Sequence, residues 1–210
     1  MLNKKPISKT VDSNFLILIK FYYSFFYKLP KTSKKVSLAK DMKLGYISFP
    51  IIEGTIRSGI LITDESTRPI EFRAVSDVKI DELQKILYGE TLQQTFLKEQ
   101  YTIDLVNAIE NLPDILLTQD KELLNVRPKL PIPVGFLTKL DPMQAIDRFS
   151  HKISDITGKF ETLMLTMHPF DERLVVPISK QLQTIYKNFN LLEPFHRIET
   201  AIKYLAEEKE

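Results

Sequence analysis

The feature that most constrains the fold is a pair of strand-like runs between residues 55 and 75. Residues 55–63 are rich in β-branched side chains, and residues 64–67 supply the polar chemistry of a turn. In the second run, one face carries Ile70, Phe72 and Ala74. Because successive side chains of a strand point to opposite faces, this alternation predicts a β-hairpin with one buried face.

The segments around the hairpin extend this pattern to a whole domain. A strand over residues 44–52 precedes it, and helices over 76–89 and 91–112 follow. The rest of the chain predicts a strand at 114–118, a helical turn at 121–126, a strand at 134–140, a helix over 141–158, a strand at 160–167, and helices at 178–189 and from Pro194 onward.

This order predicts one α/β domain: a mixed sheet that opens with an antiparallel three-strand meander, with helices packed on it. The same order of elements occurs in the ribonuclease-H-like fold, including endonuclease V. Element order by itself carries no activity with it.

Charge separates an N-terminal segment from the domain. Residues 1–43 hold ten lysines and two acidic residues, a net charge of +8, whereas the whole chain carries only +2. Residues 15–27 are a run of apolar and aromatic side chains around Lys20. A helix of thirteen residues would span roughly 20 Å, too short to cross a bilayer. We therefore predict a basic aromatic arm, residues 1–41, before a domain of residues 42–210.

Three roles remain open for this arm. It packs on the domain, it docks on an anionic membrane surface, or its lysines and aromatics bind single-stranded nucleic acid. Met42 stands just before the first predicted strand, so residues 1–41 are alternatively an upstream extension that comes from a misplaced start and is no part of the natural protein. No small-residue cleavage site follows the apolar run, which argues against a signal peptide and favours a cytoplasmic protein.

Several chemistries have no support in the sequence. The chain has no cysteine, which excludes disulfides, thiol catalysis, zinc ribbons and iron–sulfur sites. Gly54 and Gly59 have the spacing of a phosphate-binding loop, but the lysine and hydroxyl that should follow are missing. The chain also lacks the G-x-S-x-G pattern of serine hydrolases, and its three histidines are scattered.

Acidic residues at strand ends support the one enzymatic hypothesis. Two-metal phosphoryl chemistry needs several carboxylates at one edge of a sheet, because Mg²⁺ and Mn²⁺ prefer oxygen ligands. Asp120 follows a buried strand and Glu71 projects from the hairpin, so these two are the candidate catalytic residues. Asp64, which ends a strand, joins them as a candidate metal ligand. A ribonuclease-H-like first strand should supply an aspartate, yet residues 43–49 contain no acid.

Structural roles for these acids are the alternative. Asp120 is placed to cap a helix, and Glu71 to pair with Arg68 or Arg73. A further cluster of His168, Asp171 and Glu172 falls on a predicted loop, where a solvated turn is the simpler interpretation.

Three strings resemble a family of bacterial proteins that carries no assigned activity. They are Arg68-Pro69-Ile70-Glu71-Phe72, Ile86-Leu87-Tyr88-Gly89 and Glu193-Pro194-Phe195-His196-Arg197-Ile198. The likeness covers residues 43–126 and 190–207 and leaves out the arm. It implies no catalytic residue, cofactor or partner.

Since no strong catalytic signature is present, the sequence favours a non-enzymatic cytoplasmic binding or interaction protein. It would have no cofactor, and another protein would be its partner. One alternative is a divergent, metal-dependent, ribonuclease-H-like nuclease that uses Asp120 and Glu71 with Mg²⁺ or Mn²⁺. The other is a peripheral membrane protein attached through the arm.

Overall fold

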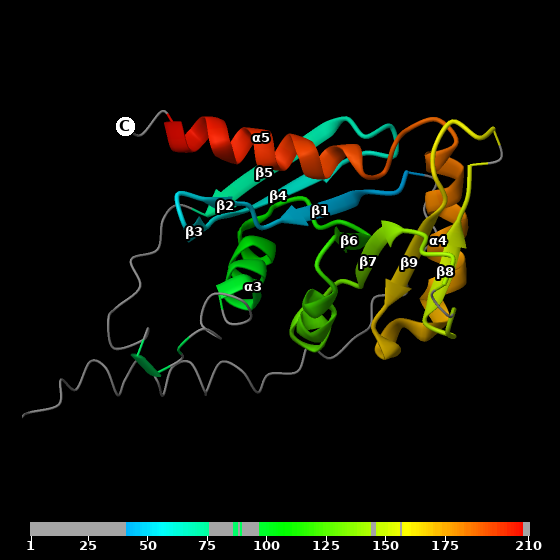
Figure 1. The fold of residues 1–210 in the computed structure, drawn as a ribbon, viewed down its shortest axis with the longest axis horizontal. Coiled ribbons are helices and arrows are strands. Elements are labelled where there is room, and N and C mark those ends of the chain that lie inside the picture. The colour runs from blue at the N-terminus through cyan, green and yellow to red at the C-terminus, as the bar shows by residue number, and fades with distance from the viewer. Residues whose placement is uncertain are drawn as a thin grey trace, which may run out of the picture. The chain divides into compact units, whose positions relative to one another are not determined.

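A computed structural model describes residues 41–75, 86–87, 89, 97–143, 146–155 and 157–207. Seven strands form one sheet in the order β5-β4-β1-β6-β7-β9-β8 (Figure 1). Their bounds are β1 (Leu44–Ser48), β4 (Ser58–Thr63), β5 (Pro69–Val75), β6 (Ile115–Thr118), β7 (Val134–Lys139), β8 (Ser150–Ile153) and β9 (Leu163–Met167). The short strands β2 (Ile51–Ile52) and β3 (Thr55–Ile56) pair only with each other.

The sheet is mixed. β4 is antiparallel to both β1 and β5, which confirms the predicted three-strand meander. β1, β6 and β7 are parallel neighbours, while β9 is antiparallel to both β7 and β8. The parallel strands are nearly continuous apolar runs, as expected where both faces of a sheet are covered. The predicted α/β fold class is therefore confirmed.

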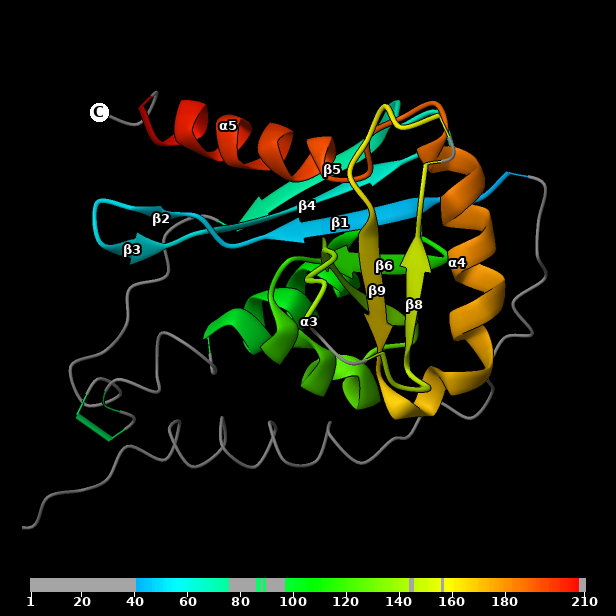
Figure 2. The ribbon, with the colours of Figure 1, turned by 45° about the vertical axis from the view of Figure 1, so that its right-hand side comes forward.

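Helices cover both faces of the sheet (Figure 2). On one face lie α3 (Lys98–Ala108) and the 3-10 helix η2 (Lys121–Lys129), which contact β4, β5 and β7. On the other face α5 (Glu193–Glu207) packs on β1 and β4, and α4 (Glu172–Tyr186) packs on β8 and β9 after the short 3-10 helix η3 (Pro169–Asp171). Among the described residues, no helix is long and apolar enough to cross a bilayer.

Two apolar cores follow from this layering, one on each face. Alternate residues of β1 and β6 divide between them. Tyr46 and Leu117 pack with α4 and α5, whereas Ile47 and Leu116 pack with α3 and η2. Because the alternation places consecutive side chains on opposite faces, each residue that follows these strands also belongs to a definite face.

The predicted helix over residues 141–158 is wrong, because this segment contains β8. Turn chemistry brackets the strand: the Asp147 carboxylate accepts a hydrogen bond from the backbone of Phe149 (2.9 Å). The Asp155 carboxylate accepts from the backbone of Thr157 (2.9 Å) and of Lys159 (2.8 Å). Such aspartate turns compete with helix formation, and pairing with β9 supplies the strand.

Other boundaries also shift. The predicted strands at 44–52 and 55–63 each divide in two, since the chain turns out of the sheet to form β2 and β3. The helix predicted at residues 178–189 begins earlier in the structure: α4 starts at Glu172 and contains Pro177. α3 ends at Ala108 rather than at residue 112. The arm and most of the predicted helix over 76–89 lie outside the described residues.

Candidate functional site

The carboxyl ends of the parallel strands are the place where open α/β sheets bind ligands. In this chain the parallel strands are β1, β6 and β7, and at the ends of the first two Ile47 lies beside Thr118. Ser48, the last residue of β1, faces α5, where its hydroxyl meets Glu199. Asp120, two residues after the end of β6, lies toward α3, where it meets Lys98.

Asp120 is engaged on the α3 side. Its carboxylate forms an ion pair with the Lys98 ammonium at 2.5 Å, and both side chains are between one fifth and one quarter exposed. It also accepts a hydrogen bond from the backbone of Glu122 (3.1 Å), which caps η2. A small pocket beside this pair is lined by Lys98, Asp120, Asn125 and Val126, among others. Asp120 thus starts a helix and carries a partly exposed ion pair.

Glu199 is the carboxylate on the α5 side, and sequence reasoning missed it. The Ser48 hydroxyl at the end of β1 donates a hydrogen bond to Glu199 Oε1 (3.2 Å) across 151 residues of sequence. Glu199 follows the fully buried Ile198 on α5 and is half-buried itself. Its position beside the helix's apolar stripe was the only local signal, and this signal does not say which strand the helix covers.

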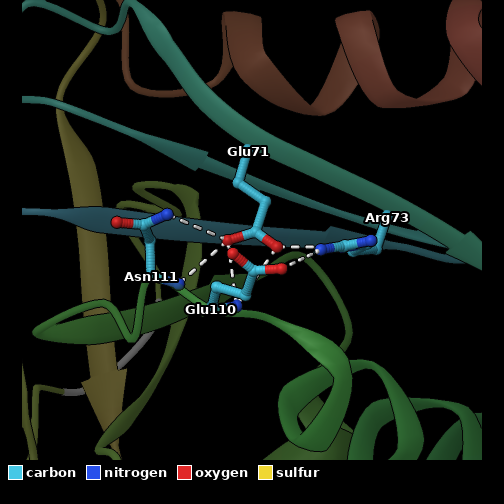
Figure 3. Close-up of polar contacts among 4 residues, drawn as sticks. All are labelled: Glu71, Arg73, Glu110 and Asn111. Atoms are coloured by element: carbon cyan, nitrogen blue, oxygen red, sulfur yellow. Dashed lines mark hydrogen bonds and ion pairs between the residues drawn. The ribbon is translucent and has the colours of Figure 1, made fainter.

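Glu71 lies at the other end of the sheet, where its carboxylate is held by four donors (Figure 3). It accepts from Arg73 Nε (2.8 Å), from the backbone of Glu110 (3.1 Å), and from the backbone (2.9 Å) and side-chain amide (3.2 Å) of Asn111. Partial burial opposes ionisation of this carboxyl, but the hydrogen bonds outweigh it and lower the pKa of Glu71 to about 2. Glu71 therefore fixes the chain after α3 beneath β5.

Asp64 is a turn residue. Its carboxylate accepts hydrogen bonds from the backbone of Ser66 (2.8 Å) and of Arg68 (2.9 Å) in the loop between β4 and β5. Since the preceding Thr63 pairs with Leu44, this loop lies at the amino end of β1.

The structure does not bring the three sequence-predicted site residues together. Glu71 is level with Leu116 through the ladder of β5, β4, β1 and β6. Asp120 therefore lies about 13 Å further along the strand direction and three strands away. Asp64 is at the same end as Glu71. Within the described ranges, no three His, Asp or Glu side chains are arranged to hold a metal ion.

The histidine and carboxylates near residue 170 are also separately engaged. Asp171, only 3% exposed, forms a two-pronged ion pair with Arg127 at 2.5 and 2.9 Å. His168 accepts a hydrogen bond from the backbone of Phe170 (3.1 Å) and so caps η3. Burial lowers the pKa of His168, and Asp171 and Arg127 act on it in opposite directions. This cluster joins η2 to the start of α4.

Comparison with known proteins adds the fold family. No family model and no curated protein matches the sequence. Among solved structures, endonuclease V from Ciona intestinalis, bound to a 23-mer DNA containing an inosine followed by a ribo-adenosine, is similar with a TM-score of 0.52. The identity is 10%, and the alignment covers 95% of this chain and 99% of that one.

Endonuclease V from Streptomyces avermitilis is similar with a TM-score of 0.50 and 8% identity, over 80% of this chain and 82% of that one. The catalytic domain of human endonuclease V matches with a TM-score of 0.47 and 10% identity, over 93% and 97% of the two chains. The matches to the Ciona intestinalis and Streptomyces avermitilis proteins show the fold alone: the chain has the ribonuclease-H-like architecture that these two structures have.

This likeness corrects the prediction of a non-enzymatic binding protein with a protein partner. These two solved structures, matched over 99% and 82% of their own lengths, are endonuclease V proteins, and the first is bound to DNA.

Proposed function

We propose that this chain is a nuclease-like protein of the ribonuclease-H-like fold, and that it binds nucleic acid at the carboxyl ends of β1 and β6. The observation that carries the proposal is the match to the DNA-bound endonuclease V over 95% of the chain. The sheet order, with β1 central between β4 and β6, supports the same location for a ligand.

A nucleic acid at this location would meet charges of both signs. The Lys98 ammonium is paired with Asp120, and Glu99 and Glu122 line the same small pocket, so a phosphate would replace Asp120 as the partner of Lys98. The Ser48 hydroxyl lies at the end of β1. Phosphate contacts from lysine and polar side chains position nucleic acids on proteins generally. The arm, with its lysines and aromatics, remains a predicted second contact for single strands.

The nuclease-like alternative implies Mg²⁺ or Mn²⁺, which carboxylates among the described residues would have to hold. The Asp120 carboxylate is paired with the Lys98 ammonium and caps η2. The Glu71 carboxylate already accepts hydrogen bonds from its own donors, among them the backbone N–H of Asn111. Glu199 hydrogen-bonds Ser48 on the opposite face from Asp120. Two metal ions need several carboxylates converging at one place. The described residues do not fit such a centre, and no catalytic step through a metal is derived.

Fluorescence anisotropy with the full chain tests the proposal. The probes are labelled single-stranded DNA, single-stranded RNA and inosine-containing duplex DNA, each with Mg²⁺, with Mn²⁺ and with EDTA. We expect binding that weakens as salt rises, because bound phosphates release counterions. Lys98→Gln should weaken binding several-fold, whereas Lys180→Gln, an exposed lysine on the distant α4, should not.

Two outcomes would overturn the proposal: no binding to any probe, or equal effects of the two lysine variants. Gel analysis of the same mixtures adds a readout for strand cleavage. Cleavage that requires Mn²⁺ or Mg²⁺ and is lost in both Asp120→Asn and Glu199→Gln would show that these two carboxylates act together, despite lying on opposite faces.

A further inference from the structure

Positive charge and the proposed binding site lie in different parts of this chain. Residues 1–43 carry a net charge of +8 and the whole chain carries +2, so residues 44–210 carry −6. Affinity for nucleic acid comes largely from lysines and arginines that neutralise phosphates and release their counterions. A domain with a net charge of −6 repels such a polyanion within about one Debye length, roughly 10 Å at 0.1 M salt.

The charges beside the proposed site show a similar balance. The start of α3 and η2 with its cap carry as many carboxylates as lysines: Lys98, Lys121, Lys129, Glu99, Asp120 and Glu122. Lys98 is paired with Asp120, and Lys129 with Glu99. On the other face α5 adds the carboxylate of Glu199. In this part of the described chain, the lysines therefore offer a phosphate backbone no excess of positive charge.

The densest positive charge of the arm stands directly before the domain. Residues 28–40 hold five lysines and no acidic residue: Lys28, Lys31, Lys34, Lys35 and Lys40. β1 begins four residues later, at Leu44, and its five residues extend about 17 Å to the proposed site. Thirteen residues can extend about 45 Å at most, so covalent geometry permits these lysines and the end of β1 to contact one strand of nucleic acid.

We propose that the lysines of residues 28–40 supply most of the electrostatic affinity of this chain for single-stranded nucleic acid, and that Lys98 adds one contact at the strand ends. This inference rests on the proposed function, in which nucleic acid binds at those ends. Residues 21–27 contain six aromatic side chains, and aromatic rings stack on bases that are free of a duplex. Lysines next to aromatics therefore favour a single strand over a duplex.

The salt dependence of binding tests the proposal, because the slope of the logarithm of the association constant against that of the salt concentration counts phosphate contacts. Fluorescence anisotropy of the full chain with labelled single-stranded DNA measures this slope. Lys→Gln substitutions at Lys28, Lys31, Lys34 and Lys35 together should make it shallower by about 3, since each contact to a single strand contributes about 0.7. Lys98→Gln should change it by no more than about 0.7.

Two matched variants separate local contacts from bulk charge. Lys→Arg substitutions at the same four arm positions keep the charge and should keep the slope. Lys→Gln substitutions at four exposed lysines of the domain remove as much charge as the arm variant does and should leave the slope unchanged; these lysines are Lys152, Lys159, Lys180 and Lys187. Circular dichroism melts check that every variant is folded.

The outcomes distinguish this inference from the proposed function. If the unsubstituted chain binds but the arm variant keeps its slope, or if the arm and domain variants lose equal slope, the inference is wrong and the proposed function stands. If the unsubstituted chain binds no probe, both are wrong. Vesicles containing phosphatidylserine are measured in parallel: an arm variant that loses vesicle binding and keeps the nucleic-acid slope would assign the arm to a membrane surface and overturn the inference.

Discussion

The carboxylates at the two ends of the sheet are held in different ways. At the amino end of β1, Glu71 accepts two backbone N–H groups, an amide and a guanidinium. At the carboxyl end, Asp120 has both kinds of partner, the backbone N–H of Glu122 and the Lys98 ammonium, and Glu199 accepts from the Ser48 hydroxyl. A carboxylate fixed by backbone donors is part of the scaffold, whereas one held by a side chain can exchange that partner for a ligand.

Glu71→Gln should give the largest loss of stability. The neutral amide loses the charge-assisted bond from Arg73 and presents only one acceptor oxygen to the backbone donors of Glu110 and Asn111. We expect the free energy of unfolding to fall by about 2–3 kcal/mol in urea titrations. Glu110→Gln is the matched control: Glu110 is 82% exposed, so its bond to Arg73 should contribute less than about 0.5 kcal/mol. Equal losses of unfolding free energy in the two variants would mean that Glu71 stabilises the fold no more than the exposed Glu110 does.

The pH dependence of stability sharpens this prediction. In the unfolded chain the Glu71 carboxyl has its ordinary pKa of 4.5, and in the folded chain its pKa is about 2. The lowered pKa means that its contribution is complete above pH 4.5 and is lost as the pH falls toward 2. Urea titrations at several pH values should show the gap between the native protein and Glu71→Gln narrowing in that window. A gap independent of pH would mean that the charge of Glu71 does not matter.

Two substitutions of Asp120 separate its cap from its ion pair. Asp120→Ala removes both and should cost about 1 kcal/mol, while Asp120→Asn keeps a capping oxygen and should cost less than about 0.5 kcal/mol. The expected difference arises because the cap bonds a backbone N–H, whereas the pair with Lys98 is partly exposed. If Asp120→Asn proves as damaging as Asp120→Ala, the ion pair belongs to the scaffold, and the contrast between the two ends weakens.

Glu199→Gln should change stability least, by less than about 0.5 kcal/mol, since glutamine still accepts from Ser48. Its effect should appear in binding instead. Removing a negative charge beside the proposed interface should tighten nucleic-acid binding a few-fold at low salt and less at high salt. Anisotropy titrations at two salt concentrations measure this, with Glu110→Gln as the control at the other end. Tighter binding in both variants would indicate bulk charge rather than a local interface.

Local patterns predicted much of the fold. The alternation over β5, the apolar run of β6 and the proline that opens α5 were each sufficient to place a strand or helix. β8 escaped prediction because Ile153 is its only buried side chain and its strand form comes from pairing with β9. A strand that forms because it pairs with another segment need not show the alternation of apolar and polar residues from which strands are predicted.

The candidate site was less accessible from the sequence. The sequence showed that Asp120 follows a buried strand and that it can cap a helix. Glu199 became a candidate only because α5 returns across β1, which brings it to Ser48. Conversely, Glu71 and Asp64 had the right residue type, but the ladder placed them at the end of the sheet away from Asp120.

The sequence by itself determined the class of fold, because side-chain periodicity and turn chemistry act between near neighbours in the chain. It also determined which chemistries have no residues to support them, such as those of thiols. Only the tertiary structure decided which carboxylates meet, which donors surround each one and which strand ends the sheet. Those properties depend on strand order and register, and these are set by packing between segments as many as 151 residues apart.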